Sequence, residues 1–184
     1  MTLETERLIL RPITKEDADD IYEYSRSPVV GPNAGWKPHA NKKETLMIIE
    51  EIFLEQENVF GIVLKETGKM IGSVGLISDP KREYGSAKML GYAIGDLYWG
   101  NGYTTEASLA VIDYGFQERY CHLITAYCYP ENDRSKRVIA KCGFEYEGTL
   151  KCAEKLFNGE VKDHQCFALF AEKYENDSLV ENNK

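Results

Sequence analysis

Three glycines fall within eight residues of the segment 95–107 (GDLYWGNGYTTEA), which runs without a break into a helix-like pattern. The first backbone N–H groups of a helix have no partner inside it, and the helix dipole favours negative charge there. Gly100 and Gly102 would let the backbone approach a phosphate without interference from a Cβ atom, and the Thr104 hydroxyl could add a contact. The residues alone therefore indicate either an anion site or a tight turn between a strand and a helix.

Two familiar phosphate loops do not fit this segment. The P-loop requires a lysine directly after its last glycine, and no lysine follows Gly100 or Gly102. The dinucleotide fingerprint requires a further glycine three residues after Gly102, where Thr105 stands instead. If the segment binds a phosphate, it belongs to another class of loop.

Size, composition and charge exclude several classes of protein. The chain has 184 residues, of which 43% are hydrophobic and 28% charged, as expected of one globular domain. Its net charge of −8 argues against general nucleic-acid binding, which needs a basic surface. No apolar run approaches the roughly 18 residues that span a bilayer, and the acidic N-terminus is not a signal peptide. We therefore expect a cytoplasmic protein with no membrane contact.

Cysteine and histidine do not suggest metal or thiol chemistry. The five cysteines are an odd number without a CxxC spacing, so we expect free thiols and no metal. Cys121 and His122 are neighbours in a predicted strand, so their side chains point to opposite faces and cannot form a nucleophile–base pair. His122 and His164 lie in strand patterns and are expected to be structural.

The elements before the glycine segment are predicted from capping residues and hydrophobic period. Thr14 with Asp17, and Asn41 with Glu44, have the spacing of capping boxes and predict the starts of two helices. A loop rich in proline and glycine separates these helices at 27–38. Alternating or short apolar runs predict strands at 5–12, 59–64, 70–77 and 89–94.

The elements after the segment complete a mixed architecture. The patterns predict a helix at 105–120, a strand at 122–129, a helix at 132–142, and hairpin strands at 144–157 and 161–171. Asn158-Gly159 is the hairpin turn, and Gly143 suits the end of the helix before it. The order predicts an α+β fold, with a mostly antiparallel sheet of about seven strands, about four helices and one central crossover. We expect one domain over 1–173 and a polar tail over 174–184.

Several motifs in this order resemble one family. Residues 98–107 (YWGNGYTTEA) resemble the pyrophosphate loop of the GNAT acyltransferase superfamily, in the form found in ribosomal-protein N-acetyltransferases of the RimJ/RimL type. The segments 5–12 (TERLILRP), 132–135 (NDRS) and 141–148 (KCGFEYEG) resemble other motifs of that family. The resemblance covers roughly residues 5–170 and implies the GNAT fold. The family loop begins with Gln or Arg, whereas Leu97 stands there in this chain.

The resemblance implies acetyl-CoA as co-substrate. It assigns cofactor binding to Tyr92, Ala93, Ile94, Trp99, Gly100, Asn101, Gly102, Tyr103, Thr104, Asn132 and Ser135. Amides of residues 99–104 would hold the diphosphate, and Leu97 would not disturb this because amides do not depend on side-chain identity. The strands at 89–94 and 122–129 would splay apart to admit the pantetheine arm. An amide near the thioester carbonyl would stabilise the oxyanion of the tetrahedral intermediate.

The resemblance also points to catalytic candidates, each with a plainer interpretation. Glu154 matches the stretch that carries the proposed catalytic glutamate in that family, and the plainer interpretation is a solvated acid on a late strand. Ser135 would protonate the leaving thiolate, although Asn132 and Ser135 are equally suited to capping a helix. Trp36 and His39 are candidates for the acceptor side, while a Trp in a loop is as often a packing anchor.

Two classes of function remain from the sequence. One is an N-acetyltransferase that acts by direct attack on either a protein N-terminus or a small amine such as an antibiotic, a polyamine or an amino acid. An α-amine of pKa about 7.8 is roughly 14% neutral at pH 7, against roughly 0.04% for a lysine, which favours the N-terminus by about 3.5 kcal/mol. The other class is a non-catalytic acyl-CoA-binding regulatory module. A monomer or a homodimer fits both.

Overall fold

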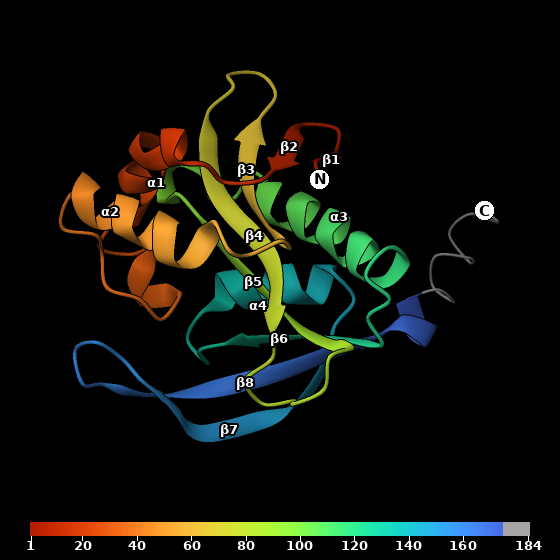
Figure 1. The fold of residues 1–184 in the computed structure, drawn as a ribbon. Coiled ribbons are helices and arrows are strands. Elements are labelled where there is room, and N and C mark those ends of the chain that lie inside the picture. Colours follow the sequence, from red (N-terminus) through yellow and green to blue (C-terminus); the bar gives the residue numbers. More distant parts are fainter. Residues whose placement is uncertain (175–184) are drawn as a thin grey trace.

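The computed structural model describes residues 1–174, in which eight strands form one sheet in the order β1-β2-β3-β4-β5-β6-β8-β7 (Figure 1). The strands are β1 (Leu3–Glu4), β2 (Leu8–Arg11), β3 (Val59–Leu64), β4 (Met70–Ser78), β5 (Ala87–Ile94), β6 (Leu123–Cys128), β7 (Glu145–Lys155) and β8 (Val161–Phe170). The α-helices of this part are α1 (Ala18–Ser25), α2 (Lys42–Ile48), α3 (Tyr103–Gln117) and α4 (Asp133–Lys141). Among the strands of residues 1–174, only β5 and β6 pair in parallel, across the α3 crossover, which confirms the predicted α+β class.

The boundaries differ from the prediction in a few places. The strand predicted at 5–12 is shorter, β2 over Leu8–Arg11, and a two-residue strand, β1, precedes the predicted range. The Thr5 hydroxyl accepts the Leu8 N–H at 3.1 Å in the turn between them. Helix α3 begins at Tyr103 rather than 105, directly after the left-handed Gly102 at φ +82°. The hairpin turn at Gly159 is confirmed, with φ +86°. Of the tail expected over 174–184, all but residue 174 lies outside the described residues.

Helices cover both faces of the sheet. Leu8 and Leu10 are fully buried on the face that α3 and α4 cover, whereas Ile9 between them packs on the face that α1 and α2 cover. Figure 1 shows α1 and α2 to one side of β3 and β4, and α3 to the other. Alternate side chains of β2 therefore belong to two separate hydrophobic cores. Within residues 1–174 no helix has the length and apolar character needed to cross a membrane.

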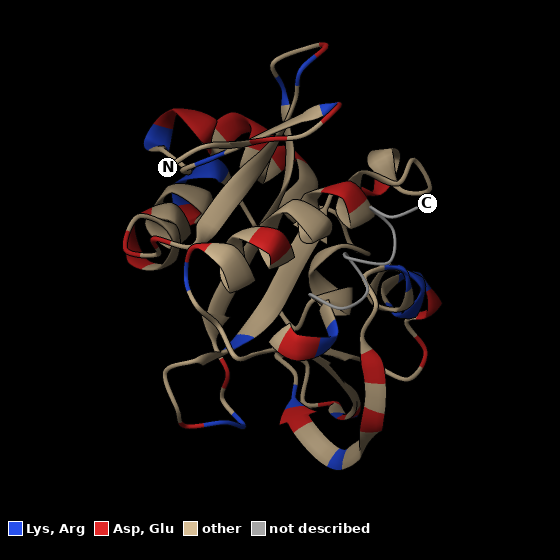
Figure 2. Cartoon of the chain, turned by 90° about the vertical axis from the view of Figure 1, so that its right-hand side faces the viewer, with Lys and Arg blue, Asp and Glu red and all other residues tan. Residues whose placement is uncertain are grey.

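Positive charge is concentrated on one short helix. The net charge of the chain is −8, yet α4 (DRSKRVIAK) contains one acid and four bases. Figure 2 shows these Lys and Arg residues together on α4. Helix α4 itself packs against α3 and β6, close to the middle of the sheet.

Arg11 and Asp17 anchor the first helical segment to β2. The Arg11 guanidinium donates two hydrogen bonds to the Asp17 carboxylate, at 2.6 and 2.9 Å. Asp17 also accepts the Thr14 N–H at 2.8 Å, which confirms the predicted capping box. The second predicted cap is confirmed as well, since the Asn41 side chain accepts the Glu44 N–H at 3.0 Å.

We expect Asp17→Asn to destabilise the protein by about 1–3 kcal/mol at pH 7, because it weakens a buried, charge-assisted network. Burial alone would raise the pKa of Asp17, but hydrogen bonds from Arg11 and Thr14 hold it below its ordinary value. Such a carboxylate stabilises the fold above its unfolded pKa of about 3.9, and the contribution is lost as pH falls through the folded pKa. Urea unfolding should therefore show a smaller difference between wild type and variant under acid than at neutral pH. Asp19→Asn is the exposed control, and equal differences at both pH values would contradict the assignment.

The middle of the sheet opens between β5 and β6. Strand β4 pairs with β5 along its length, from Ser78 opposite Lys88 to Gly72 opposite Ile94. Strand β6 pairs with β5 only over 87–89, opposite 123–125. Beyond this point the two strands separate, which confirms the splay expected between 89–94 and 122–129.

Candidate active site

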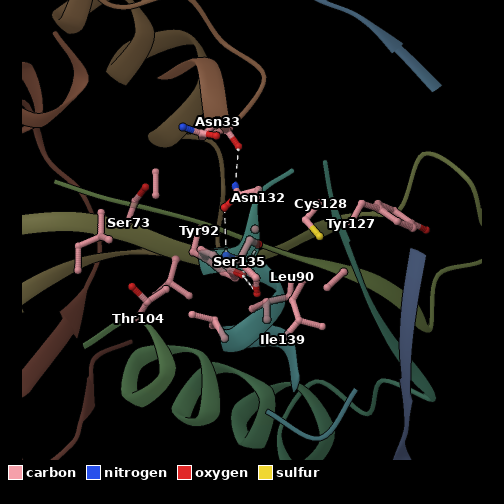
Figure 3. A pocket seen from close by; sticks show the side chains of 18 of the residues that line it. Asn33, Ser73, Leu90, Tyr92, Thr104, Tyr127, Cys128, Asn132, Ser135 and Ile139 are labelled. Atoms are coloured by element: carbon pink, nitrogen blue, oxygen red, sulfur yellow. Dashed lines mark hydrogen bonds between the residues drawn. The ribbon is translucent and has the colours of Figure 1, made fainter. Parts of the chain in front are cut away.

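A cleft of about 960 Å³ occupies the opening between β5 and β6 (Figure 3). Its walls are β5 from Met89 to Ile94, the glycine segment before α3, and helix α4. The loop around Asn33 and Trp36 and the side chain of Glu154 close its other end. Most of the residues selected from the sequence therefore meet in one place.

The β5 edge presents backbone polar groups to this cleft. Gly95, directly after β5, donates its N–H to the Ile71 carbonyl at 2.8 Å. Because hydrogen-bonded pairs alternate along an antiparallel ladder, Ala93 and Gly91 also bond to β4. The polar groups of Tyr92 and Ile94 then point the other way, into the opening. The Trp99 indole donates to the Ile94 carbonyl at 3.0 Å and so occupies that acceptor. The N–H groups of Tyr92 and Ile94 face the cleft. An extended ligand could pair with this strand as a further strand would.

The glycine segment forms the turn that starts α3. Gly100 and Gly102 have φ of +83° and +82°, the left-handed region that favours glycine. No atom lies within 4 Å of a Cβ built at Gly100, so conformation rather than lack of space requires glycine there. The cleft is lined here by Trp99, Gly100, Gly102, Tyr103 and Thr104. Asn101 is exposed instead, and its Nδ2 donates to the Tyr98 carbonyl at 3.1 Å, so its side chain stabilises the turn.

Bases on α4 add positive charge opposite this turn. Arg134, Arg137 and Lys141 all line the cleft, and the Arg134 guanidinium lies 4.3 Å from the centre of the Trp99 ring. The motifs in the sequence did not point to these residues. Their spacing was a usable signal, because positions three and seven residues apart share one helix face. Together with the first N–H groups of α3, they make this end of the cleft suited to phosphate groups.

Asn132 and Ser135 begin α4 and face the middle of the cleft. Asn132 caps the helix by accepting the Ser135 N–H at 3.1 Å, and its own Nδ2 donates to the Asn33 carbonyl at 3.4 Å. The hydroxyls of Tyr92 and Ser135 share a hydrogen bond of 2.7 Å (Figure 3). Burial raises the pKa of Tyr92, so its hydroxyl stays protonated at neutral pH. The cap uses the backbone N–H of Ser135 and not its hydroxyl, so capping and a chemical role of the hydroxyl are compatible.

A bulge in β7 brings Glu154 to the cleft. Leu150 lies opposite His164 and Glu154 opposite Lys162, so two extra residues of β7 lie between these pairs. Cys152, in the bulge, has a positive φ of +51°. Bulges of this kind change the direction of a side chain and occur often beside active sites. The Glu154 side chain is 34% exposed, consistent with access from the cleft.

His164 is not the purely structural histidine expected from its strand pattern. It lines the cleft, and its Nε2 lies 3.0 Å from Oε2 of Glu154. This contact could not be predicted from the sequence because it depends on the register of β7 against β8. His122 is exposed on the same face of the fold as Phe170, whose ring centre is 6.0 Å away.

The two acceptor-side candidates differ in position. Trp36 lines the cleft, as expected. His39 does not line it: this residue is buried, 5.3 Å from the Trp36 ring, and its Nδ1 is hydrogen-bonded to the Thr45 hydroxyl at 2.9 Å. Burial lowers the pKa of His39, so the ring is held neutral. In this structure His39 supports Trp36 rather than reaching a ligand.

The charged side chains that line the cleft are mostly basic. Among the described residues that line the cleft, Glu154 is the one carboxylate, whereas Lys81 adds to the three bases of α4. Cys128 also lines the cleft, but burial raises the pKa of its thiol to about 11. Only about one such thiol in 10⁴ is ionised at pH 7, so it is a poor nucleophile. The site is arranged for a single proton acceptor and an anionic ligand.

Comparisons with known proteins agree with this geometry. The family model of the acetyltransferase (GNAT) domain matches residues 7–145. The chain is 35% identical over 177 residues to the uncharacterized N-acetyltransferase p20 of Bacillus licheniformis, covering 94% of this chain and 98% of that protein. It is 32% identical over 182 residues to the ribosomal protein uS5-alanine N-acetyltransferase of Escherichia coli, covering 91% and 89%. A GNAT-family acetyltransferase from Bacillus anthracis superposes with a TM-score of 0.82 at 26% identity, covering 94% and 99%.

Proposed function

The chain belongs to the GNAT acetyltransferase family and is an N-acetyltransferase; we propose that its acceptor is a protein N-terminal α-amine, which attacks acetyl-CoA directly. The observation that carries this proposal is the single carboxylate, Glu154, among the described residues that line the cleft. A polyamine or an aminoglycoside carries several positive charges and needs several carboxylates, whereas an α-amine needs one. The E. coli relative is named for acetylating the alanine of ribosomal protein uS5, which supports the same choice.

The described residues fit acetyl-CoA. The left-handed glycine turn and the N–H groups that open α3 would hold its diphosphate, together with Arg134 and Arg137. The edge of β5 would pair with the pantetheine arm through Tyr92 and Ile94. When bound, acetyl-CoA supplies the acetyl group as a thioester. The N–H groups of Tyr92 and Ile94 face the opening and would stabilise negative charge on the carbonyl oxygen.

Two groups would handle the protons of the reaction. Glu154 accepts a proton from the acceptor ammonium, which leaves the neutral nitrogen that attack requires. Ser135, hydrogen-bonded to Tyr92 at 2.7 Å, would protonate the departing thiolate. Direct attack is favoured because the thiol of Cys128 is held neutral by burial, so no acyl-cysteine step is supported by the lining.

The acceptor end of the cleft suits a short apolar N-terminus. Its walls are apolar side chains with two amides: Val30, Asn33, Trp36, Ile52, Phe53 and Gln56. Asn and Gln side chains can bond an extended peptide backbone, while the apolar groups would pack on a small first residue.

Thiol release from acetyl-CoA over a panel of amines tests the proposal. We expect release with peptides that begin in alanine or serine, and much less with spermidine or with an Nα-blocked peptide that contains lysine. Release with spermidine but not with the peptides would overturn the acceptor assignment. Calorimetric binding of acetyl-CoA with no release from any amine would favour the non-catalytic module instead.

Arg7→Met should raise the KM for acetyl-CoA by roughly 3- to 10-fold and change kcat much less. Arg7 donates to the Asn101 carbonyl at 3.0 Å and to Oε2 of Glu106 at 2.7 Å, and its guanidinium lies 4.6 Å from the Tyr103 ring centre. These contacts hold the glycine turn from outside the cleft. Steady-state kinetics of the variant checks this, with the exposed Arg119→Met as control. An unchanged KM would mean that the turn keeps its shape without Arg7.

A further inference from the structure

Four side chains form a continuous polar network at the acceptor end of the cleft. Lys81 Nζ donates to Nδ1 of His164 at 3.2 Å, and Nε2 of His164 lies 3.0 Å from Oε2 of Glu154. The Tyr129 hydroxyl donates to the same oxygen at 2.8 Å. Lys81 lies in the β4–β5 connection, His164 in β8, Glu154 in β7 and Tyr129 directly after β6, so the fold brings together four separate segments. We call this set, Lys81, His164, Glu154 and Tyr129, the Glu154 network.

The donors and acceptors of the network allow one arrangement of hydrogens. An ammonium group can only donate, so Nδ1 of His164 must accept from Lys81. A neutral imidazole then carries its hydrogen on Nε2, and this N–H donates to Glu154. Lys81 thus fixes the tautomer of His164 and gives the network a direction, from Lys81 through His164 to the carboxylate.

Lys81 is itself held in place independently of Glu154. The Asp79 side chain is fully buried and accepts the Lys81 N–H at 2.8 Å and the Tyr127 hydroxyl at 2.7 Å. The Lys81 ammonium lies 3.8 Å from the centre of the Tyr127 ring, a cation–π contact. Backbone and side chain of Lys81 are therefore both fixed beside His164.

The two oxygens of Glu154 have different surroundings. Oε2 receives two donors, from His164 and Tyr129. Within residues 1–174 no hydrogen bond reaches Oε1, which lies against the acceptor-side loop: a Cβ built at Gly35 would be only 2.8 Å from it. Oε1 is thus the oxygen with capacity for a new proton, and it faces the loop that carries Trp36.

We propose that His164, set in its Nε2–H form by Lys81, is a positioning residue that directs Oε1 of Glu154 toward the acceptor amine. This inference rests on the proposed function. An N–H bond of the acceptor ammonium breaks and an O–H bond forms at Oε1, and the electron pair of the broken N–H bond stays on nitrogen for attack on the thioester. His164 and Lys81 keep their own protons throughout.

Kinetics of three variants tests the proposal. His164→Leu should lower kcat about tenfold with little change in the KM for acetyl-CoA, because the base loses its orientation but the cofactor end is untouched. His164→Gln keeps a donor near the position of Nε2 and should recover most of the loss. Lys81→Met should lower kcat roughly threefold, because the histidine tautomer is no longer fixed. His122→Gln and Lys43→Met are the surface controls.

NMR of the imidazole nitrogens supplies a readout that a purely structural role would not move. The chain has three histidines, so removing each in turn assigns the signals. Ligand-free wild type should show His164 as the Nε2–H form, and Lys81→Met should show a mixture of tautomers. Wild-type kcat in both His164→Leu and Lys81→Met, or an Nδ1–H form in the wild type, would overturn the inference. Failure of wild type to acetylate any amine would instead overturn the proposed function, and the tautomer would still be measurable.

Discussion

Replacing Glu154 with Gln should lower kcat by about 10²- to 10³-fold and leave the affinity for acetyl-CoA almost unchanged. Gln has nearly the same shape and can still accept hydrogen bonds from Tyr129 and His164, but it cannot take a proton from an ammonium group. The hydrogen-bond partners of the Glu154 side chain within residues 1–174 are Tyr129 and His164, neither of which belongs to the glycine turn or α4, so we expect cofactor binding not to depend on it. Steady-state kinetics with an alanine-terminal peptide and calorimetry with acetyl-CoA separate the two effects.

The pH dependence of Glu154→Gln gives a second check. Without a base, the rate should follow the neutral fraction of the acceptor amine and rise about tenfold per pH unit below the amine pKa of about 7.8. Wild type should show a weaker dependence because the enzyme removes the proton. Glu145→Gln is the matched control, an exposed acid of the same strand that pairs with Lys173. A wild-type rate and pH profile in Glu154→Gln would remove this residue from the mechanism.

Features set by neighbours in the sequence were predictable. The capping box of Thr14 and Asp17 involves residues three apart, and the turn at Gly159 needs only a left-handed residue between two strands. The glycine turn before α3 is of the same kind, because its φ values and the helix that follows are local properties. The order of the GNAT-like motifs along the chain then extended the prediction from these local elements to the whole fold.

Features set by strand register and long-range contacts were not predictable. His164 reaches Glu154 only because the bulge in β7 adds two residues between Leu150 and Glu154, and no hydrophobic pattern reveals a bulge. Arg7 supports the turn at Asn101 across 94 residues of sequence. Trp36 and His39 were both expected on the acceptor side, but only Trp36 lines the cleft, because the His39 ring is buried behind it and hydrogen-bonded to Thr45 of α2.

Gly102→Asp should weaken acetyl-CoA binding about 100-fold, equivalent to ~2.7 kcal/mol, while its thermal midpoint should fall no further than that of Gly102→Asn, which has the same positive φ. The substitution places a Cβ atom and a carboxylate where the backbone turns into α3, and like charges would oppose the diphosphate there. A Cβ built at Gly102 meets no atom closer than Arg7 Nη2 at 3.5 Å, so the fold has room for the side chain. The remaining cost to the fold is the positive φ of +82°.

Two controls separate charge at the cleft from backbone strain. Gly102→Asn has a similar size and tolerates positive φ but carries no charge, so its effect on the dissociation constant should be much smaller. Gly68→Asp adds the same carboxylate at a similar φ of +72° in the β3–β4 turn, outside the cleft, and should leave binding unchanged. Calorimetry with acetyl-CoA on the three variants measures these differences. If Gly102→Asp binds as tightly as Gly68→Asp, the diphosphate is not held at the start of α3, and the arrangement of the cofactor in the cleft must be different.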